Sequence, residues 1–280
     1  MTTAYNNTFV NSELFAPLVA AAQYAAYENS VARQITTVFD MPANSGKVVQ
    51  IPVWSAISAG TPDEGEAATF QDTNTSSVNL TLSEKVVAHR ITDMLRDSAY
   101  NDVMAQLGDQ AGRSIAEKMD AEAFAEFANF TDDLGSSGKE LVVADLFAAA
   151  AYLRSNKLTG PFYAVLHPGS AFNIKKSLTG TSSFQQATTA GDNVFGGFYL
   201  GTIAGIACYE SALVGVSSND ATNAVFAPQA IAHSMRGSIR LETQRQAAFR
   251  ATDLVLTAVS GAKVIQPTFG VKLTADKRIN

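Results

Sequence analysis

The most regular apolar pattern in this chain runs from Asn101 to Asn129. Charged residues separate the apolar ones, as in an amphipathic helix. The apolar residues recur at every fourth position: Val103, Leu107, Ala111, Ile115, Met119, Ala123 and Phe127. A helix of this length would be roughly 45 Å long at 1.5 Å per residue. Strict four-residue spacing drifts around an ideal helix, so we expect the stripe to contact several elements in turn and the helix to act as a girder.

A second pattern predicts a long hairpin over residues 47–87. Lys47–Trp54 is typical of a strand, with Pro52 marking an edge, and Ser77–Val87 alternates apolar and polar residues. The loop between them contains no Lys or Arg, and its acidic residues are Asp63, Glu64, Glu66 and Asp72. A two-stranded ribbon is marginal in water, and long loops are uncommon unless they are functional. We therefore expect the hairpin to lie on a partner.

The remaining patterns predict helices and strands in mixed order. Helices are expected over Glu13–Glu28, over Val143–Ser155 and from His167-Pro168 onward. Strands are expected over Phe162–Leu166, Gly201–Tyr209 and Asn223–Ile231, with two or three more in Ser238–Leu273, and Gly180–Asn193 is expected to be a mobile loop. Because no regular βαβ rhythm is visible, the predicted fold class is α+β.

Composition narrows the functional classes. The chain has 280 residues, of which 46% are hydrophobic and 16% charged, enough for one elaborated domain or two smaller ones. A net charge of −6 argues against a dedicated nucleic-acid-binding protein. The single cysteine, Cys208, excludes an intrachain disulfide and fits a reducing compartment. The most apolar segment, Leu14–Ala26, is too short to span a bilayer, and no signal-peptide pattern precedes it, so we expect no membrane partner.

The sequence contains no concentrated catalytic motif. A phosphate-binding loop is absent, and His89, His167 and His233 do not stand at metal-ligand spacing. His167 follows a predicted buried strand, and we interpret it as a residue of a helix start or a subunit contact. Cys208 lies in an apolar strand and is interpreted as a core residue. We therefore predict no catalytic residue, no metal site and no cofactor, and a protein that is not an enzyme.

The order of elements resembles the HK97-type major capsid proteins of tailed bacteriophages, and the resemblance covers nearly the whole chain. It rests on IPVW before the hairpin tip and SEK after it, on the long helix, on FYAVLHPGS at Phe162–Ser170, and on the closing run Glu242–Pro267. The fold implied by this resemblance consists of an N-terminal arm and helix (1–46), an E-loop hairpin (47–87), a P-domain with a spine helix (88–140), an A-domain (141–235) and a C-terminal return through the P-domain (236–280).

The resemblance implies a structural function. The chain would self-assemble, as hexamers and pentamers, into the icosahedral shell that encloses double-stranded phage DNA. It would be assembled in the bacterial cytoplasm and reside in the virion. Some family members begin with a fused scaffolding segment, for which this chain has no room, so a separate scaffolding protein is implied. Further implied partners are a portal protein, a decoration protein and the packaged DNA, which would be contacted non-specifically.

The resemblance also suggests which residues make intersubunit contacts. On the E-loop these are Trp54, Asp63, Glu64, Glu66 and Asp72, and on the N-terminal arm they are Phe9, Leu14 and Phe15. Arg90, Arg96 and Arg113 are candidate basic partners for the acidic loop.

Three alternatives remain open at this stage. An encapsulin-type nanocompartment has the same fold and would enclose enzyme cargo instead of nucleic acid. A cytoplasmic hydrolase would place a pocket around His167. A tail-tube or other virion protein is disfavoured by the long helix.

Overall fold

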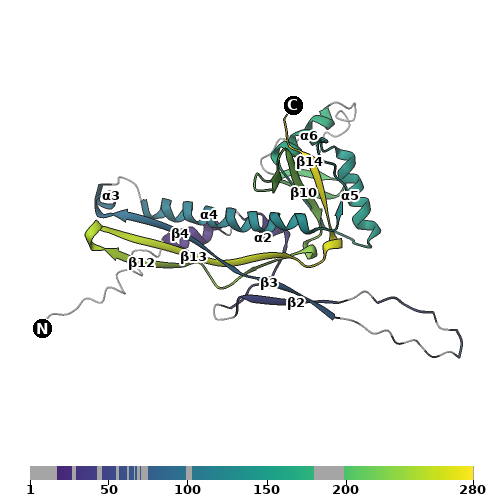
Figure 1. The fold of residues 1–280 in the computed structure, drawn as a ribbon, viewed down its shortest axis with the longest axis horizontal. Helices are drawn as coiled ribbons and strands as arrows, with labels where there is room; N and C mark the ends of the chain where they lie inside the picture. Colours follow the sequence, from purple (N-terminus) through teal and green to yellow (C-terminus); the bar gives the residue numbers. More distant parts are fainter. Residues whose placement is uncertain are drawn as a thin grey trace.

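The computed structural model describes residues 18–26, 30–42, 46–54, 57–61, 63–65, 67, 70, 75–98, 103–179 and 199–279. These residues form an elongated helix-on-sheet unit, a compact unit at one end of it, and a projecting hairpin (Figure 1). The loop predicted over Gly180–Asn193 and the first residues of the expected arm lie outside these ranges.

The elongated unit consists of α4 (Val103–Ala125) lying along a five-stranded sheet. The strand order is β1-β11-β13-β12, with β4 on the other side of β13. The strands are β1 (Thr37–Val38), β4 (Ser83–Thr92), β11 (Ile231–Met235), β12 (Arg240–Gln246) and β13 (Ala251–Val264). Ile115 and Met119 of α4 pack against Leu254, Leu256 and Ala258 of β13. The long helix is therefore confirmed, with its last turn replaced by the 3-10 helix η1 (Glu126–Asn129).

Residues 18–26 are helical and cross α4 at very short range. A Cβ atom added at Gly112 would lie 2.3 Å from the carbonyl oxygen of Ala22, and one added at Gly108 would lie 2.6 Å from that of Leu18. Both glycines are needed because the two backbones are nearly in contact. For residues 18–26, this confirms the predicted N-terminal helix and its packing against another element.

Buried polar groups join α4 to its neighbours. The Lys85 ammonium of β4 lies 2.6 Å from Glu122 Oε2 of α4 and donates a hydrogen bond to the Ser260 carbonyl oxygen at 2.6 Å. Asp120 accepts hydrogen bonds from the Ser30 hydroxyl and from two backbone N–H groups at the start of α2 (Ala32–Ile35). Burial raises the pKa of the Asp120 carboxyl. These contacts fix residues 30–35 on the helix.

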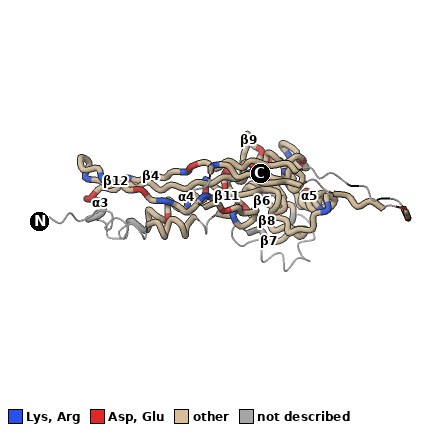
Figure 2. Tube along the Cα trace, turned by 90° about the horizontal axis from the view of Figure 1, so that it is seen from below, with Lys and Arg blue, Asp and Glu red and all other residues tan. Residues whose placement is uncertain are grey.

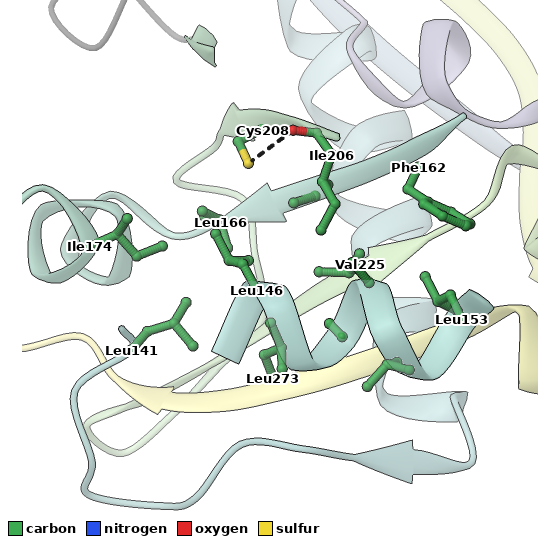
Figure 3. Packing of buried hydrophobic residues seen from close by; sticks show 14 of the residues in the cluster. Leu141, Leu146, Leu153, Phe162, Leu166, Ile174, Ile206, Cys208, Val225 and Leu273 are labelled. Carbon is green, nitrogen blue, oxygen red and sulfur yellow. Dashed lines mark hydrogen bonds between the residues drawn. The ribbon is translucent and has the colours of Figure 1, made fainter. Parts of the chain in front are cut away.

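The compact unit is a mixed sheet of order β5-β14-β10-β6-β8-β7, with β9 beside β10. Its strands are β5 (Asp132–Asp133), β6 (Phe162–Leu166), β7 (Tyr199–Ile203), β8 (Ile206–Glu210), β9 (Val216–Ser217), β10 (Asp220–Phe226) and β14 (Gly270–Asp276). Helices α5 (Val143–Ser155) and α6 (Pro168–Thr179) pack against it. Leu146 and Leu153 of α5 meet Phe162, Val225 and Leu273 in a closed apolar core (Figure 3). The predictions of α5, β6 and the start of α6 are confirmed.

Three strand predictions need correction. Ser77–Val87 is not one strand: β3 (Thr75–Thr81) pairs with β2 (Val48–Trp54), and after Leu82 the chain enters β4, which pairs with β13. The alternating pattern continues through Leu80 and Leu82 because both side chains are buried at the hairpin base. An alternating apolar and polar pattern indicates which side chains are buried, but it does not identify the strand with which a segment pairs.

The other two corrections concern turns. Gly201–Tyr209 forms part of a hairpin, β7 and β8, because Ala204 and Gly205 both adopt positive φ in the turn. Asn223–Ile231 is interrupted by the 3-10 helix η3 (Pro228–Ala230) between β10 and β11. The closing run Ser238–Leu273 contains three strands, β12, β13 and most of β14, as predicted, with the 3-10 helices η4 (Ala247–Phe249) and η5 (Pro267–Phe269) between them.

We predict that Gly112→Ala destabilises the subunit, although alanine is the better helix former. The helix preference for alanine contributes about 1 kcal/mol, whereas the added methyl group would overpack a backbone contact at a cost of about 1–3 kcal/mol. Urea unfolding should show a net decrease in the free energy of unfolding, and amide hydrogen exchange should accelerate in residues 18–26. Ser114→Ala, at an exposed site of the same helix, is the control and should not accelerate it. Unchanged protection of residues 18–26 in Gly112→Ala would contradict the close crossing.

Candidate shell interface

The β2–β3 hairpin is anchored firmly at its base. Ile51, Leu80 and Leu82 are buried in a small apolar cluster with Ala232 of β11. A Cβ atom at Gly261 of β13 would lie 2.6 Å from the Thr81 carbonyl oxygen, so the hairpin crosses β13 at backbone distance. The strands are paired along their whole length, from Val48 opposite Thr81 to Trp54 opposite Thr75. The hairpin is therefore a fixed extension of the body.

Beyond this base, the hairpin exposes large apolar side chains. Trp54 is 65% exposed, Ile57 68% and Phe70 97%. The structure places the predicted contact residues Asp63 and Glu64 on the same extension, both exposed, whereas Glu66 and Asp72 lie outside the described residues. An isolated subunit gains nothing from exposing aromatic rings on a projecting ribbon, and exposed apolar patches mark interaction sites.

Two of the three candidate basic partners already have partners within the chain. Arg90 donates to Asp253 through Nε at 2.5 Å and Nη2 at 2.9 Å. Arg113 pairs with Asp109 one turn earlier on α4, at 2.9 Å. Both pairs are substantially exposed, so their Coulomb attraction is screened by water. The side chain of Arg96 and the arm residues Phe9, Leu14 and Phe15 lie outside the described residues.

The end of the elongated unit that lies opposite the hairpin (Figure 1) also carries exposed apolar side chains. It combines α3 (Asp93–Ser98) with the turn between β12 and β13. Met94 is 81% exposed, Leu95 46% and Phe249 63%. We call Met94, Leu95, Phe249 and Arg250 together the distal end. No sequence pattern pointed to it, although Met94, Leu95 and Phe249 each stand beside charged residues or one another in the sequence.

The groups that could carry chemistry serve structural roles instead. The Cys208 thiol is fully buried, and burial raises its pKa to about 12, so it is not a thiolate nucleophile near neutral pH. His167 Nδ1 accepts a hydrogen bond from the Gly169 backbone N–H at 3.1 Å, which places it at the start of α6. Burial, with a smaller contribution from Lys277, lowers the His167 pKa.

Two further features are absent from the described part of the chain. No group of three or more His, Cys, Asp or Glu side chains there could hold a metal ion. No described helix is both long enough and apolar enough to cross a membrane.

His233 is a buried titratable group in the sheet of the elongated unit. It lies on β11, and neither ring nitrogen has a hydrogen-bond partner among the described residues. Burial lowers its pKa to about 4, and the positive charges of Arg33 and Lys85 act in the same direction, with Asp40 opposing them. The imidazole is therefore neutral in the folded subunit at neutral pH.

Sequence comparison now identifies the family. A model of the family described as phage capsid protein matches residues 75–273, more than half of the chain. The chain belongs to the phage capsid protein family. The matched region begins on the hairpin and includes α4, the compact unit and nearly all of the closing strands. No curated protein matches the sequence.

Solved capsid structures share the fold at low sequence identity. The chain is similar to one in the Mycobacterium phage Che8 structure, at 21% identity and a TM-score of 0.65, covering 82% of this chain and 85% of that one. It is similar to the capsid of cyanophage P-SCSP1u at 20% identity and a TM-score of 0.62, covering 86% of each chain. It is also similar to the capsid of Ralstonia phage GP4 at 11% identity and a TM-score of 0.68, covering 88% of each chain. The fold is the HK97-type capsid fold, as the resemblance in sequence implied.

These findings establish a major capsid protein that forms the virion shell by self-assembly, and they identify a structural protein, not an enzyme. They do not favour the encapsulin or the hydrolase alternative. The exposed extensions of the capsid protein are accordingly the candidate functional site, in place of a pocket.

We predict that His233 makes the capsid protein acid-sensitive. The unfolded chain takes up this proton near pH 6.5 and the folded chain only near pH 4, so stability should fall as pH decreases between these values and not further below them. The free energy of unfolding should decrease by about 3 kcal/mol over this pH range. Urea unfolding at pH 7.5 and 4.5 would measure it, and His233→Met should flatten the dependence. Protonation of Asp120, whose pKa is raised, works in the opposite direction. An unflattened slope in His233→Met would assign the acid sensitivity elsewhere.

Proposed function

We propose that the capsid protein builds its shell mainly by laying the β2–β3 hairpin across an adjacent subunit. The observation that carries this proposal is the contrast between a buried base, with Leu80 fully enclosed, and an exposed extension carrying Trp54, Ile57 and Phe70. Burying these side chains against a neighbour would remove apolar surface from water, which is the dominant favourable contribution to protein association. The hairpin would act as the E-loop of the HK97-type fold.

The charges of the loop would determine how the hairpin aligns on the neighbouring subunit more than how tightly it binds. Asp63 and Glu64 are exposed, and the loop sequence has no basic residue. An exposed ion pair contributes only about 0.2–1 kcal/mol, so the value of such pairs lies in their repetition and in excluding wrong alignments. Figure 2 shows Lys and Arg interspersed with Asp and Glu along the described part of the chain.

The remaining assignments of the fold belong to the same proposal. Residues 1–46 would act as an N-terminal arm whose Phe9, Leu14 and Phe15 contact a neighbour. Residues 88–140 and 236–280 would form the P-domain, and residues 141–235 the A-domain. Two contacts support this division: Ile115 and Met119 of α4 pack against strand β13, and residues 18–26 lie on α4 at Gly108 and Gly112.

We further propose that the shell encloses double-stranded DNA and is made of hexamers and pentamers assembled in the host cytoplasm. A separate scaffolding protein, a portal and a decoration protein would be its partners. The interspersed positions of basic and acidic residues along the described chain support weak, non-specific contact with DNA, since dedicated phosphate binding requires clustered Lys and Arg.

Shortening the hairpin tests the proposed contact. Replacing residues 55–74 by an Asn-Gly turn keeps all paired residues of β2 and β3, and Asn-Gly suits a two-residue hairpin turn. The variant should fold with an unchanged circular dichroism spectrum and fail to form shells, by light scattering and electron microscopy. Val216→Ser, at an exposed apolar residue of β9 in the compact unit, is the matched control and should assemble. Normal shells from the shortened hairpin would refute the proposal.

A further inference from the structure

Residues 30–42, which we call the strap, tie α4 to the edge of the elongated sheet. The strap contains α2 and β1, and β1 pairs in parallel with β11 at the end of that sheet. Asp120 of α4 accepts three hydrogen bonds from the start of the strap. Beyond β1, the Phe39 and Met41 backbone N–H groups donate to carbonyl oxygens of β11 at 2.8 and 3.0 Å. Short segments at a sheet edge open at lower free energy than central strands do, so the strap is suited to local release.

The strap also forms part of the seat of the hairpin. Phe39 and Met41 pack against the apolar cluster at the hairpin base, in which Leu80 is fully buried. The Ser234 hydroxyl of β11 donates a hydrogen bond to the Phe39 carbonyl oxygen at 2.5 Å, which holds this part of the strap in place. Movement of the strap would therefore reach the β2–β3 hairpin directly.

His233 is the buried neighbour of the strap on β11, between Val38 of β1 and Ala262 of β13. It is 1% exposed, and neither ring nitrogen has a hydrogen-bond partner in the described part of the chain. A neutral imidazole can remain in such a site at moderate cost, whereas the protonated ring carries a charge and two N–H donors without an acceptor. Adding a proton to His233 therefore favours a state in which the ring reaches water.

The charged groups around His233 strengthen this effect. Arg33 of α2 and Lys85 of β4 are both positive and oppose its protonation, and Asp40 near the end of the strap counteracts them. Lys85 is held in place by the Glu122 carboxylate of α4 at 2.6 Å. Arg33 belongs to the strap, where the side chain of its partner Asp40 is 61% exposed. Of the two cations, Arg33 is therefore the one that can move away, and it moves with the strap.

We infer that the strap is an acid-released latch: protonation of His233 frees residues 30–42 from β11 and loosens the hairpin base, while the compact unit stays folded. The protonated ring reaches water once the edge strand β1 leaves β11, and Arg33 leaves with it. Phe39 and Met41 then no longer pack on the hairpin base. The latch belongs to the single subunit, so it goes beyond the proposed hairpin contact and does not depend on it.

Hydrogen exchange of the full-length subunit at pH 7.5 and 5.0 tests the latch, with rates corrected for the intrinsic effect of pH. The pKa of His233 is near 6.5 when the ring is exposed and about 4 when it is buried. The population of the open strap should therefore increase about 30-fold between the two pH values. Exchange in residues 30–42 and 48–54 should accelerate, and exchange in β10 of the compact unit should not. Unchanged exchange in residues 30–42 would overturn the latch.

His233→Met removes the titratable ring from the buried site and should abolish the acceleration. A second group works in the opposite direction, because burial raises the pKa of Asp120 and its protonation therefore favours the closed strap. The pH response of His233→Met should accordingly be flat or slightly reversed. His167→Gln is the matched control, since it removes a histidine of the compact unit, and it should keep the full response.

Two outcomes of this comparison count against the inference. Acceleration that persists in His233→Met would assign the opening to another group. Acceleration in residues 30–42 without acceleration in residues 48–54 would refute the coupling of the strap to the hairpin.

Thiol labelling tests the latch without altering His233. Thr36→Cys places a thiol of similar size at a buried position of the strap, and the native Cys208 thiol is buried in the compact unit. Relative to the unfolded chain, labelling of the introduced thiol should accelerate about 30-fold between pH 7.5 and 5.0, and Cys208 should stay protected. Equal acceleration at both thiols would indicate global unfolding and overturn the latch, and protection of both thiols at pH 5.0 would overturn it as well.

Discussion

The packing of α4 along β13 is the contact on which the rest of the subunit depends. Ile115 and Met119 of α4 pack against Leu254 and Leu256 of β13, and the helix lies along the sheet (Figure 1). The N-terminal helix lies on α4 at Gly112, and the compact unit follows directly from its C-terminal end. A straight helix on a sheet keeps the two ends of the molecule at a fixed separation, which a shell of repeated subunits requires.

The hairpin can project because its base is paired into this frame. A free two-stranded ribbon would be marginal in water. Here Leu80 and Leu82 are buried against β11, and Gly261 lets the ribbon cross β13 at backbone distance. The stability of the extension therefore comes from the body, which leaves its exposed aromatic residues available to a neighbour. The same frame holds α3 against the β12–β13 turn through Arg245 and Asp93 at the other end.

The sequence predicted the elements whose signals are local. The four-residue stripe in α4, the alanine-rich α5 and the FYAVL strand β6 are decided by neighbouring residues, and all three are confirmed. The division at Leu82 was missed because alternation does not reveal that β3 and β4 pair with different strands. The Arg90 partner could not be predicted either, since Asp253 lies 163 positions away. The Arg113–Asp109 pair has i,i+4 spacing and was open to prediction.

The buried polar groups explain why this frame has one arrangement. Lys85 is nearly fully buried, and its charge is balanced by Glu122 of α4 and by oxygen atoms of Ser83 and Ser260. Removing one partner of such a pair would leave a charge without compensation in a region of low dielectric constant. A purely apolar interface could shift along the helix axis by a turn, whereas the Lys85–Glu122 ion pair forms in only one register of α4 on the sheet. Fixing the register of α4 on the sheet fixes the positions of both exposed ends, and with them the geometry that each subunit presents to the shell.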